Sequence, residues 1–248
     1  MKAMIFAAGM GTRLKPLTDT MPKALVPVEG APLLAHTIQH LCQVGVDEIV
    51  VNVHHFAPMI VDYLRQHDFP CEIKISDESE MLLETGGGLR KASALFGTDD
   101  SPILIHNVDI FSNANLQTFY ERNRHESAAL MVSSRKSSRQ LLFNDQLELV
   151  GWTNLNTGEV RTPFNNLDIE KCHRYAFSGI HLFSPSLFPL MEDFPERFSI
   201  IDFYLKICDR VKIKADVREG LKMLDVGKQD TLREAEDFLE QLKVLGRV

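Results

Sequence analysis

The 248-residue sequence predicts an α/β fold in which a doubly wound, mostly parallel sheet carries an added antiparallel β region. In the first half, apolar runs of strand length alternate with segments of helical periodicity, and this order predicts right-handed βαβ units. In the second half, short strand-like runs follow one another across turns, which is typical of antiparallel pairing. No linker, repeat or low-complexity tract interrupts the chain, so we expect a single domain over residues 1–248.

The first half, residues 1–127, is expected to hold strands that alternate with helices. Strands are predicted where short apolar runs occur, at residues 1–8, 48–53, 71–75 and 102–107. Helices are predicted at residues 32–44, 58–66, 86–95 and 116–125. Gly45 suits the end of the first helix, and Pro58 suits the first turn of the second.

The second half, residues 128–248, is expected to be richer in strands. These are predicted at residues 128–134, 141–143, 147–152, 175–183, 211–215 and 222–225, with short helices at 186–190 and 200–208. The turn residues Asn144 and Asp145 predict a hairpin between two of the strands. Thr231 and Glu234 have the spacing of a capping box, which predicts that the last helix begins at Thr231.

The composition excludes several classes of function. The formal net charge of -7 argues against a non-specific nucleic-acid binder, which needs a basic face. No run of about 18 apolar residues occurs, so we expect no membrane partner. The N-terminus lacks the basic and long apolar segments of a secretory signal. The four cysteines are widely spaced and form no CxxC pair, which is typical of reduced core residues in a cytoplasmic protein.

The most informative segment is the loop at residues 9–23, which follows the first predicted strand. Ligands of open α/β sheets bind beyond the carboxyl ends of the strands, so this loop lies where a ligand is expected. Gly9 and Gly11 let the backbone approach an anion closely. Thr12 adds a hydroxyl donor, and Arg13 adds a charged fork that suits phosphate. The loop lacks both the GK[ST] of a Walker loop and the third glycine of the dinucleotide fingerprint.

The loop matches, at every fixed position, the pattern G-x-G-T-R-x-x-P-x-T-x-x-x-x-K of the sugar nucleotidyltransferases. This resemblance implies a Rossmann-like, GT-A-like fold and an enzyme that joins a nucleoside triphosphate to a sugar 1-phosphate and releases pyrophosphate. It also implies roles for single residues: Arg13 binds the β- and γ-phosphates, and Lys23 neutralises charge near the α-phosphate. The triphosphate-binding set implied by the resemblance is Ala8, Gly9, Gly11, Thr12, Arg13 and Lys23.

Two aspartates are candidate ligands for Mg²⁺, which is usually held by one or two carboxylates together with phosphate oxygens and water. Asp109 follows the strand predicted at 102–107, where the family has its first metal ligand. The family usually has glycine before this aspartate, and this chain has Val108. Asp225 resembles the aspartate of the family's late W-x-D-x-G-T segment, although Met223 replaces the tryptophan and Lys228 the threonine.

The segment at residues 84–88, Glu-Thr-Gly-Gly-Gly, is a second glycine-rich turn. The resemblance places backbone donors for the nucleobase at Thr85 and Gly86. A carboxylate shortly before this turn suits the N3–H of uracil or thymine, and we expect Glu80 to supply it, with Glu78 as the second choice.

The sugar is expected to contact Asn107, Ser178 and Gly179, since the strand at 175–183 resembles the family strand whose small residues admit sugar hydroxyls. The Glu-Lys-Pro motif of the thymidylyltransferase branch is absent, and residues 151–154 stand near its expected position. The groups that hold the sugar phosphate are therefore open. Arg139 is one candidate, and an equally good interpretation is a solvated arginine before an edge strand.

The stretch Leu-Glu-Thr-Gly-Gly-Gly resembles the branch of uridylyltransferases that act on N-acetylmuramic acid 1-phosphate in cell-wall recycling. Mannose- and heptose-phosphate guanylyltransferases are the alternative, and a non-catalytic sensor of nucleotide-sugars with the same fold is another. A nicotinamide-dependent dehydrogenase is disfavoured, because the full GxGxxG is missing. We expect no C-terminal β-helix, and a monomer or small homo-oligomer.

Overall fold

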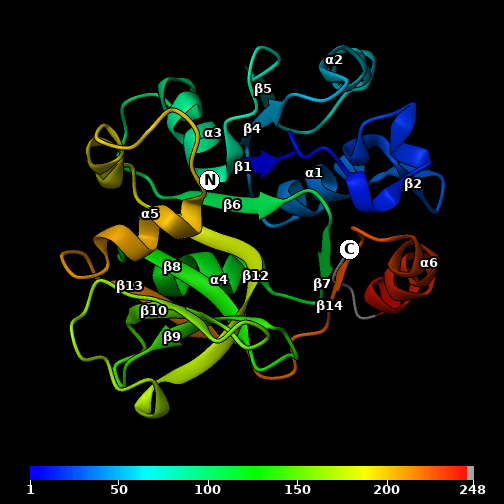
Figure 1. The fold of residues 1–248 in the computed structure, drawn as a ribbon. Coiled ribbons are helices and arrows are strands. Elements are labelled where there is room, and N and C mark those ends of the chain that lie inside the picture. Colours follow the sequence, from blue (N-terminus) through cyan, green and yellow to red (C-terminus); the bar gives the residue numbers. More distant parts are fainter. Residues whose placement is uncertain (245–248) are drawn as a thin grey trace.

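The computed structural model describes residues 1–244 and confirms the α/β fold, with a large mixed sheet at its centre (Figure 1). The main path of this ten-stranded sheet has the order β11-β10-β9-β12-β6-β1-β4-β5. From one edge to the other these strands are β11 Glu159–Arg161, β10 Leu149–Asn154, β9 Arg139–Phe143, β12 His173–Phe183, β6 Ile103–Asn107, β1 Lys2–Phe6, β4 Glu48–Val53 and β5 Glu72–Asp77. Two further strands, β8 (Ala128–Ser133) and β13 (Ile213–Val217), extend the sheet beside β12.

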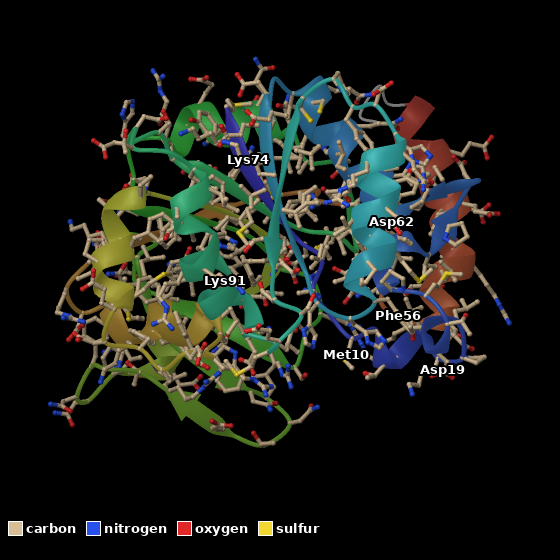
Figure 2. The ribbon with its side chains drawn as sticks, turned by 90° about the horizontal axis from the view of Figure 1, so that it is seen from above. Met10, Asp19, Phe56, Asp62, Lys74 and Lys91 are labelled. Carbon is tan, nitrogen blue, oxygen red and sulfur yellow. The ribbon has the colours of Figure 1, made fainter. Side chains whose placement is uncertain are left out.

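The four strands from the first half of the chain form the parallel part of the sheet. β1 lies between β4 and β6 and is parallel to both, and β5 is parallel to β4. The carboxyl ends of these strands therefore share one edge of the sheet. Figure 2 labels Met10 and Phe56, which follow β1 and β4, at the same end of the molecule.

Helices cover both faces of the sheet, as the doubly wound prediction requires. Alternate residues of β1 belong to different cores: Ala3 and Ile5 to one, Met4 and Phe6 to the other. The first core is covered by α1 (Leu33–Gln43), α2 (Ala57–Gln66), α4 (Leu116–Asn123) and α6 (Gln229–Val244). The second is covered by α3 (Glu84–Ala92) and α5 (Ile200–Ile207).

The long strand β12 joins the two halves of the chain in one sheet. It is antiparallel to β6 on one side and to β8 and β9 on the other. The predicted hairpin at Asn144 is confirmed between β9 and β10. The side-chain oxygen of Asn144 accepts hydrogen bonds from the backbone N–H groups of Gln146 and Glu148, at 3.0 and 2.9 Å, and so closes the turn.

Several short elements were not predicted from the sequence. They are the hairpin of β2 (Pro27–Val28) with β3 (Ala31–Pro32), the strand β11, and the strand β7 (Ile110–Ser112), which pairs with β14 (Met223–Asp225). The predicted start of the last helix was wrong. Helix α6 begins at Gln229, and the Thr231 hydroxyl donates to the Lys228 carbonyl at 3.0 Å instead of capping the helix from outside.

The structure of residues 1–244 bears on two expectations from composition, the absence of a membrane-spanning helix and the burial of the cysteines. Within these residues, no helix combines the length and apolar character needed to cross a membrane. The cysteines are all free, but only Cys208 is buried, and Cys42, Cys71 and Cys172 are half-buried.

Candidate functional site

A cleft of about 390 Å³ lies where β1, β4 and β6 end. It takes residues from the phosphate loop, from the start of α3 and from the segment after β6. The lining residues are Phe6, Ala7, Ala8, Gly9, Lys23, Asn52, Leu82, Glu84, Thr85, Asn107, Val108, Asp109 and Ser199. The cleft therefore contains predicted ligands of the triphosphate, the base, the sugar and the metal.

The phosphate loop is held by Gly11, which has a positive φ of 64°. A Cβ at this position would lie 2.8 Å from Cγ2 of Thr18 and 3.0 Å from Cβ of Lys23. The Gly11 carbonyl accepts from the Thr18 hydroxyl and from the backbone N–H of Leu14, both at 2.8 Å. Gly11 therefore lets the loop fold back on itself and brings Lys23 toward the cleft.

We expect Gly11→Ala to destabilise the protein by about 2 kcal/mol, because it combines an unfavourable φ with a steric clash. Gly9→Ala is the matched control, since a Cβ at Gly9 meets nothing within 4 Å. Urea unfolding of both variants measures the difference. Equal stability of the two variants would contradict the assigned role of Gly11.

Lys23 and Asp109 form an ion pair in the cleft, and their side chains are 12% and 14% exposed. Asp109 follows Val108, whose side chain is buried in the core and whose carbonyl accepts from the Thr37 hydroxyl at 3.2 Å. The backbone N–H of Val108 donates to the Phe6 carbonyl at 3.2 Å. The valine that replaces the family glycine is thus part of the core, and Asp109 still reaches the cleft.

The second predicted metal ligand, Asp225, is brought beside Asp109 by the pairing of β14 with β7. The backbone N–H of Val226 donates to the Asp109 carbonyl at 2.8 Å. Arg13 Nη2 lies 3.6 Å from Asp225 Oδ2. A Cβ at Gly227 would lie 2.5 Å from Asp225 Oδ1 and 2.6 Å from Arg13 Nη2, so a larger residue there would displace the ends of these two side chains. The four residues Arg13, Lys23, Asp109 and Asp225 therefore gather as two adjacent cation–carboxylate pairs.

The two aspartates suit a hard divalent cation only if other ligands complete its shell. Within residues 1–244, no group of three or more His, Cys, Asp and Glu side chains is placed to hold a metal ion. Mg²⁺ commonly keeps several waters and binds one or two carboxylates plus substrate phosphates. The donor set of Asp109 and Asp225 fits that mode of binding.

Of the two residues predicted to bind the nucleobase through the backbone, Thr85 and Gly86, only Thr85 lines the cleft. The Thr85 hydroxyl accepts from the backbone N–H of Ile200 at 2.9 Å. The backbone N–H of Gly86 donates to the Phe198 carbonyl at 2.9 Å, and a Cβ there would lie 2.4 Å from the Phe198 ring. Gly86 is therefore occupied by packing of α3 against residues 196–198, and its N–H is not presented to the cleft.

The carboxylate proposed for the base does not reach the cleft. Glu80 lines a separate hollow with Arg90, Lys91 and residues around them, so we correct its assignment as a base ligand. The second choice, Glu78, is fully buried. It accepts from Asn52 Nδ2 at 2.7 Å and from the backbone N–H of Leu83 at 3.2 Å, and burial raises its pKa.

Asn52 is a cleft residue that the sequence analysis missed. Its Oδ1 accepts from the backbone N–H of Ala7 at 2.8 Å, and so joins the ends of β1 and β4 at the cleft. An asparagine near the end of the otherwise apolar run Ile-Val-Val-Asn-Val was the available signal. Leu82, Glu84 and Ser199 also line the cleft, and of these only Glu84 belongs to a segment that the sequence singled out.

Of the three predicted sugar ligands, Asn107 lines the cleft. Gly179 has a φ of 80°, and a Cβ there would lie 2.7 Å from Asn107 Nδ2, so it leaves room for that amide. Ser178 is 1% exposed, and its hydroxyl donates to the Met131 carbonyl at 2.7 Å. The Ser178 hydroxyl therefore holds β12 against β8.

A second, larger hollow of about 870 Å³ is lined by Arg13, Asp225 and residues of the antiparallel strands. We call it the basic hollow. Its lining residues are Arg13, Arg135, Ser137, Ser138, Arg139, Gln140, Leu141, Trp152, Phe177, Ile201, Asp225 and Lys228. Asp109 lines the cleft and Asp225 lines the basic hollow, and the hydrogen bond from the Val226 N–H to the Asp109 carbonyl joins the two segments that carry them.

Comparison with known proteins settles the family. The nucleotidyl transferase family profile matches residues 2–140, more than half of the chain. The chain belongs to the nucleotidyl transferase family. This transferase is 30% identical over 228 residues, 89% of its own length and 90% of the relative's, to the N-acetylmuramate alpha-1-phosphate uridylyltransferase of Caulobacter vibrioides. The predicted class of enzyme, a sugar-1-phosphate nucleotidyltransferase, is confirmed.

One further relative in sequence and one solved structure are also similar to this chain. The mannose-1-phosphate guanyltransferase of Aspergillus oryzae is 34% identical over 144 residues, which cover 56% of this transferase and 39% of the relative. The UDP-glucose pyrophosphorylase of Acinetobacter baumanii superposes with a TM-score of 0.76 at 17% identity, with 98% of each chain covered. The predicted fold is thereby confirmed over both halves of the chain.

Proposed function

We propose that this transferase joins UTP to N-acetylmuramate 1-phosphate and forms UDP-N-acetylmuramate and pyrophosphate. The observation that carries the proposal is the similarity to the Caulobacter uridylyltransferase, which extends over nine-tenths of both chains. The similarity to the Aspergillus guanyltransferase covers 56% of this transferase and 39% of that relative. Because nucleoside triphosphates are made and used in the cytoplasm, we place the reaction there.

The reaction needs no general base, because the phosphate of the sugar is already ionised at neutral pH. One of its oxygens forms a bond to the α-phosphorus of UTP, and the bond from that phosphorus to the bridging oxygen breaks in line, so that the electron pair leaves with pyrophosphate. Two like charges about 4 Å apart repel by about 4 kcal/mol at an effective dielectric of 20. Lys23 and Arg13 offset this repulsion and orient the triphosphate.

Asp109 and Asp225 would hold Mg²⁺ together with phosphate oxygens, and the ion would supply positive charge that offsets the charge on the reacting phosphates. In the free protein these carboxylates pair with Lys23 and Arg13. Each cation is thus held beside the site that the triphosphate would enter. We propose that both lysine and arginine exchange a carboxylate partner for phosphate oxygens when UTP and the metal bind.

A substrate panel tests the proposal. Release of pyrophosphate is measured with UTP, dTTP, GTP and CTP against the 1-phosphates of N-acetylmuramate, glucose, mannose and heptose. We expect turnover to be fastest with UTP and N-acetylmuramate 1-phosphate. Preference for GTP with mannose or heptose 1-phosphate would establish the guanylyltransferase instead. Nucleotide-sugar binding without turnover of any pair would establish a sensor.

A further inference from the structure

The basic hollow carries more positive charge than one sugar phosphate needs. Arg13, Arg135, Arg139 and Lys228 line it, and Asp225 is its only carboxylate among the lining residues. Asp225 pairs with Arg13. Within residues 1–244, no carboxylate lies within 4 Å of the charged groups of Arg135, Arg139 or Lys228. Three cations therefore face this hollow without an anionic partner from the protein.

The strand geometry directs one of these arginines into the hollow. Arg139 and Leu141 are two residues apart on β9 and so share a face of the sheet. Leu141 lies opposite Trp152, and Arg139 opposite Asn154. Since Leu141 and Trp152 line the hollow, Arg139 extends the same face beyond this apolar pair.

The second arginine, Arg135, is held by a hydrogen bond to the backbone of β12. Arg135 lies in the loop between β8 and β9, and its Nη2 donates to the Phe177 carbonyl at 2.9 Å. Phe177 also lines the hollow. One hydrogen bond to a backbone carbonyl leaves most of the guanidinium donors of Arg135 available, because arginine has five N–H groups. The two arginines thus stand over an apolar floor of Leu141, Trp152 and Phe177.

The geometry points to a carboxylate on the sugar as the partner of Arg135 and Arg139. This inference rests on the proposed function and adds to it the residues that select the acceptor. Arg13 and Lys23 are assigned to the triphosphate. The 1-phosphate of an uncharged sugar brings only one anionic group, its phosphate, to the remaining cations of the hollow. A guanidinium pairs with a carboxylate through two parallel N–H···O bonds. N-acetylmuramate 1-phosphate has such a carboxylate on its lactyl group, which glucose, mannose and N-acetylglucosamine 1-phosphates lack.

A matched pair of acceptors tests this assignment. N-acetylmuramate 1-phosphate and N-acetylglucosamine 1-phosphate differ only in the lactyl group. We expect Arg139→Gln and Arg135→Gln each to lower kcat/KM for the first about 10- to 100-fold, the loss expected for a hydrogen bond to a charged group. The second acceptor should change by less than about threefold in each variant, and the KM for UTP should stay constant. Arg139→Lys should recover part of the loss, because it keeps the charge and loses the fork.

Arg122→Gln, on the exposed side of α4, is the control and should leave both acceptors unchanged. An equal loss for both acceptors, or a raised KM for UTP, would overturn the inference and assign the arginines to a phosphate. If the wild-type protein turns over neither acceptor, the proposed reaction fails, and calorimetric binding of the two compounds decides the inference alone. Equal affinities, unaffected by Arg139→Gln, would then reject a carboxylate site.

Discussion

Asp109→Asn is expected to lower Mg²⁺-dependent release of pyrophosphate by about 1,000-fold or more. Asparagine fills the same space and leaves the backbone bond from Val226 to the Asp109 carbonyl intact. It removes the charge that would hold the metal and leaves Lys23 without its carboxylate. Charge stabilisation of about 4 kcal/mol is typical of one strong electrostatic contact in a transition state, and each 1.36 kcal/mol is a factor of ten in rate.

The measurement is pyrophosphate release over a titration of Mg²⁺ for the wild type, Asp109→Asn and the control Asp62→Asn. Asp62 is an exposed aspartate on α2, labelled in Figure 2. The control should keep wild-type turnover at every Mg²⁺ concentration. Unchanged turnover of Asp109→Asn would remove Asp109 from the metal site.

Lys23→Ala is expected to lower kcat/KM by about 100-fold, because one of the two cationic side chains proposed to bind the triphosphate is lost. It also breaks an ion pair whose two side chains are both largely buried, so some stability should be lost as well. Activity must therefore be expressed per folded molecule, with the folded fraction measured by circular dichroism at the assay temperature.

Lys74→Ala provides the matched comparison. Lys74 of β5 forms an ion pair with Glu48 of β4 at 2.9 Å. Figure 2 shows Lys74 toward the end of the molecule away from Met10. The Lys74→Ala variant should be less stable than the wild type and should keep the wild-type activity per folded molecule. If Lys23→Ala behaves in the same way, Lys23 supports only the structure of the loop.

The sequence was most informative where function depends on neighbours along the chain. The loop at 9–23 follows its strand directly, so the order of residues alone was enough to place its glycines and Lys23 at the edge of the sheet. Asp109 could be placed for the same reason. Asp225 followed from the resemblance alone, because its position beside Asp109 depends on pairing of the two short strands β7 and β14.

The sequence was least informative where packing between distant segments decides which group is free. Glu80 and Glu78 differ by two residues, yet one lies in a separate hollow and the other is buried against Asn52. Gly86 follows Thr85, yet the Gly86 N–H donates to the Phe198 carbonyl, whereas Thr85 lines the cleft. The basic hollow has the same origin, since Arg13, Arg139 and Lys228 come from three distant parts of the chain.

Because β14 carries Asp225 to β7, a segment that is synthesised long after Asp109 supplies half of the carboxylate pair. Synthesis proceeds from the N-terminus, and the parallel strands with the phosphate loop can form long before β14 emerges. A nascent chain that ends before residue 223 would expose Asp109 and Lys23 without Asp225 or Gly227. Such a chain should bind nucleotide weakly and consume none of it.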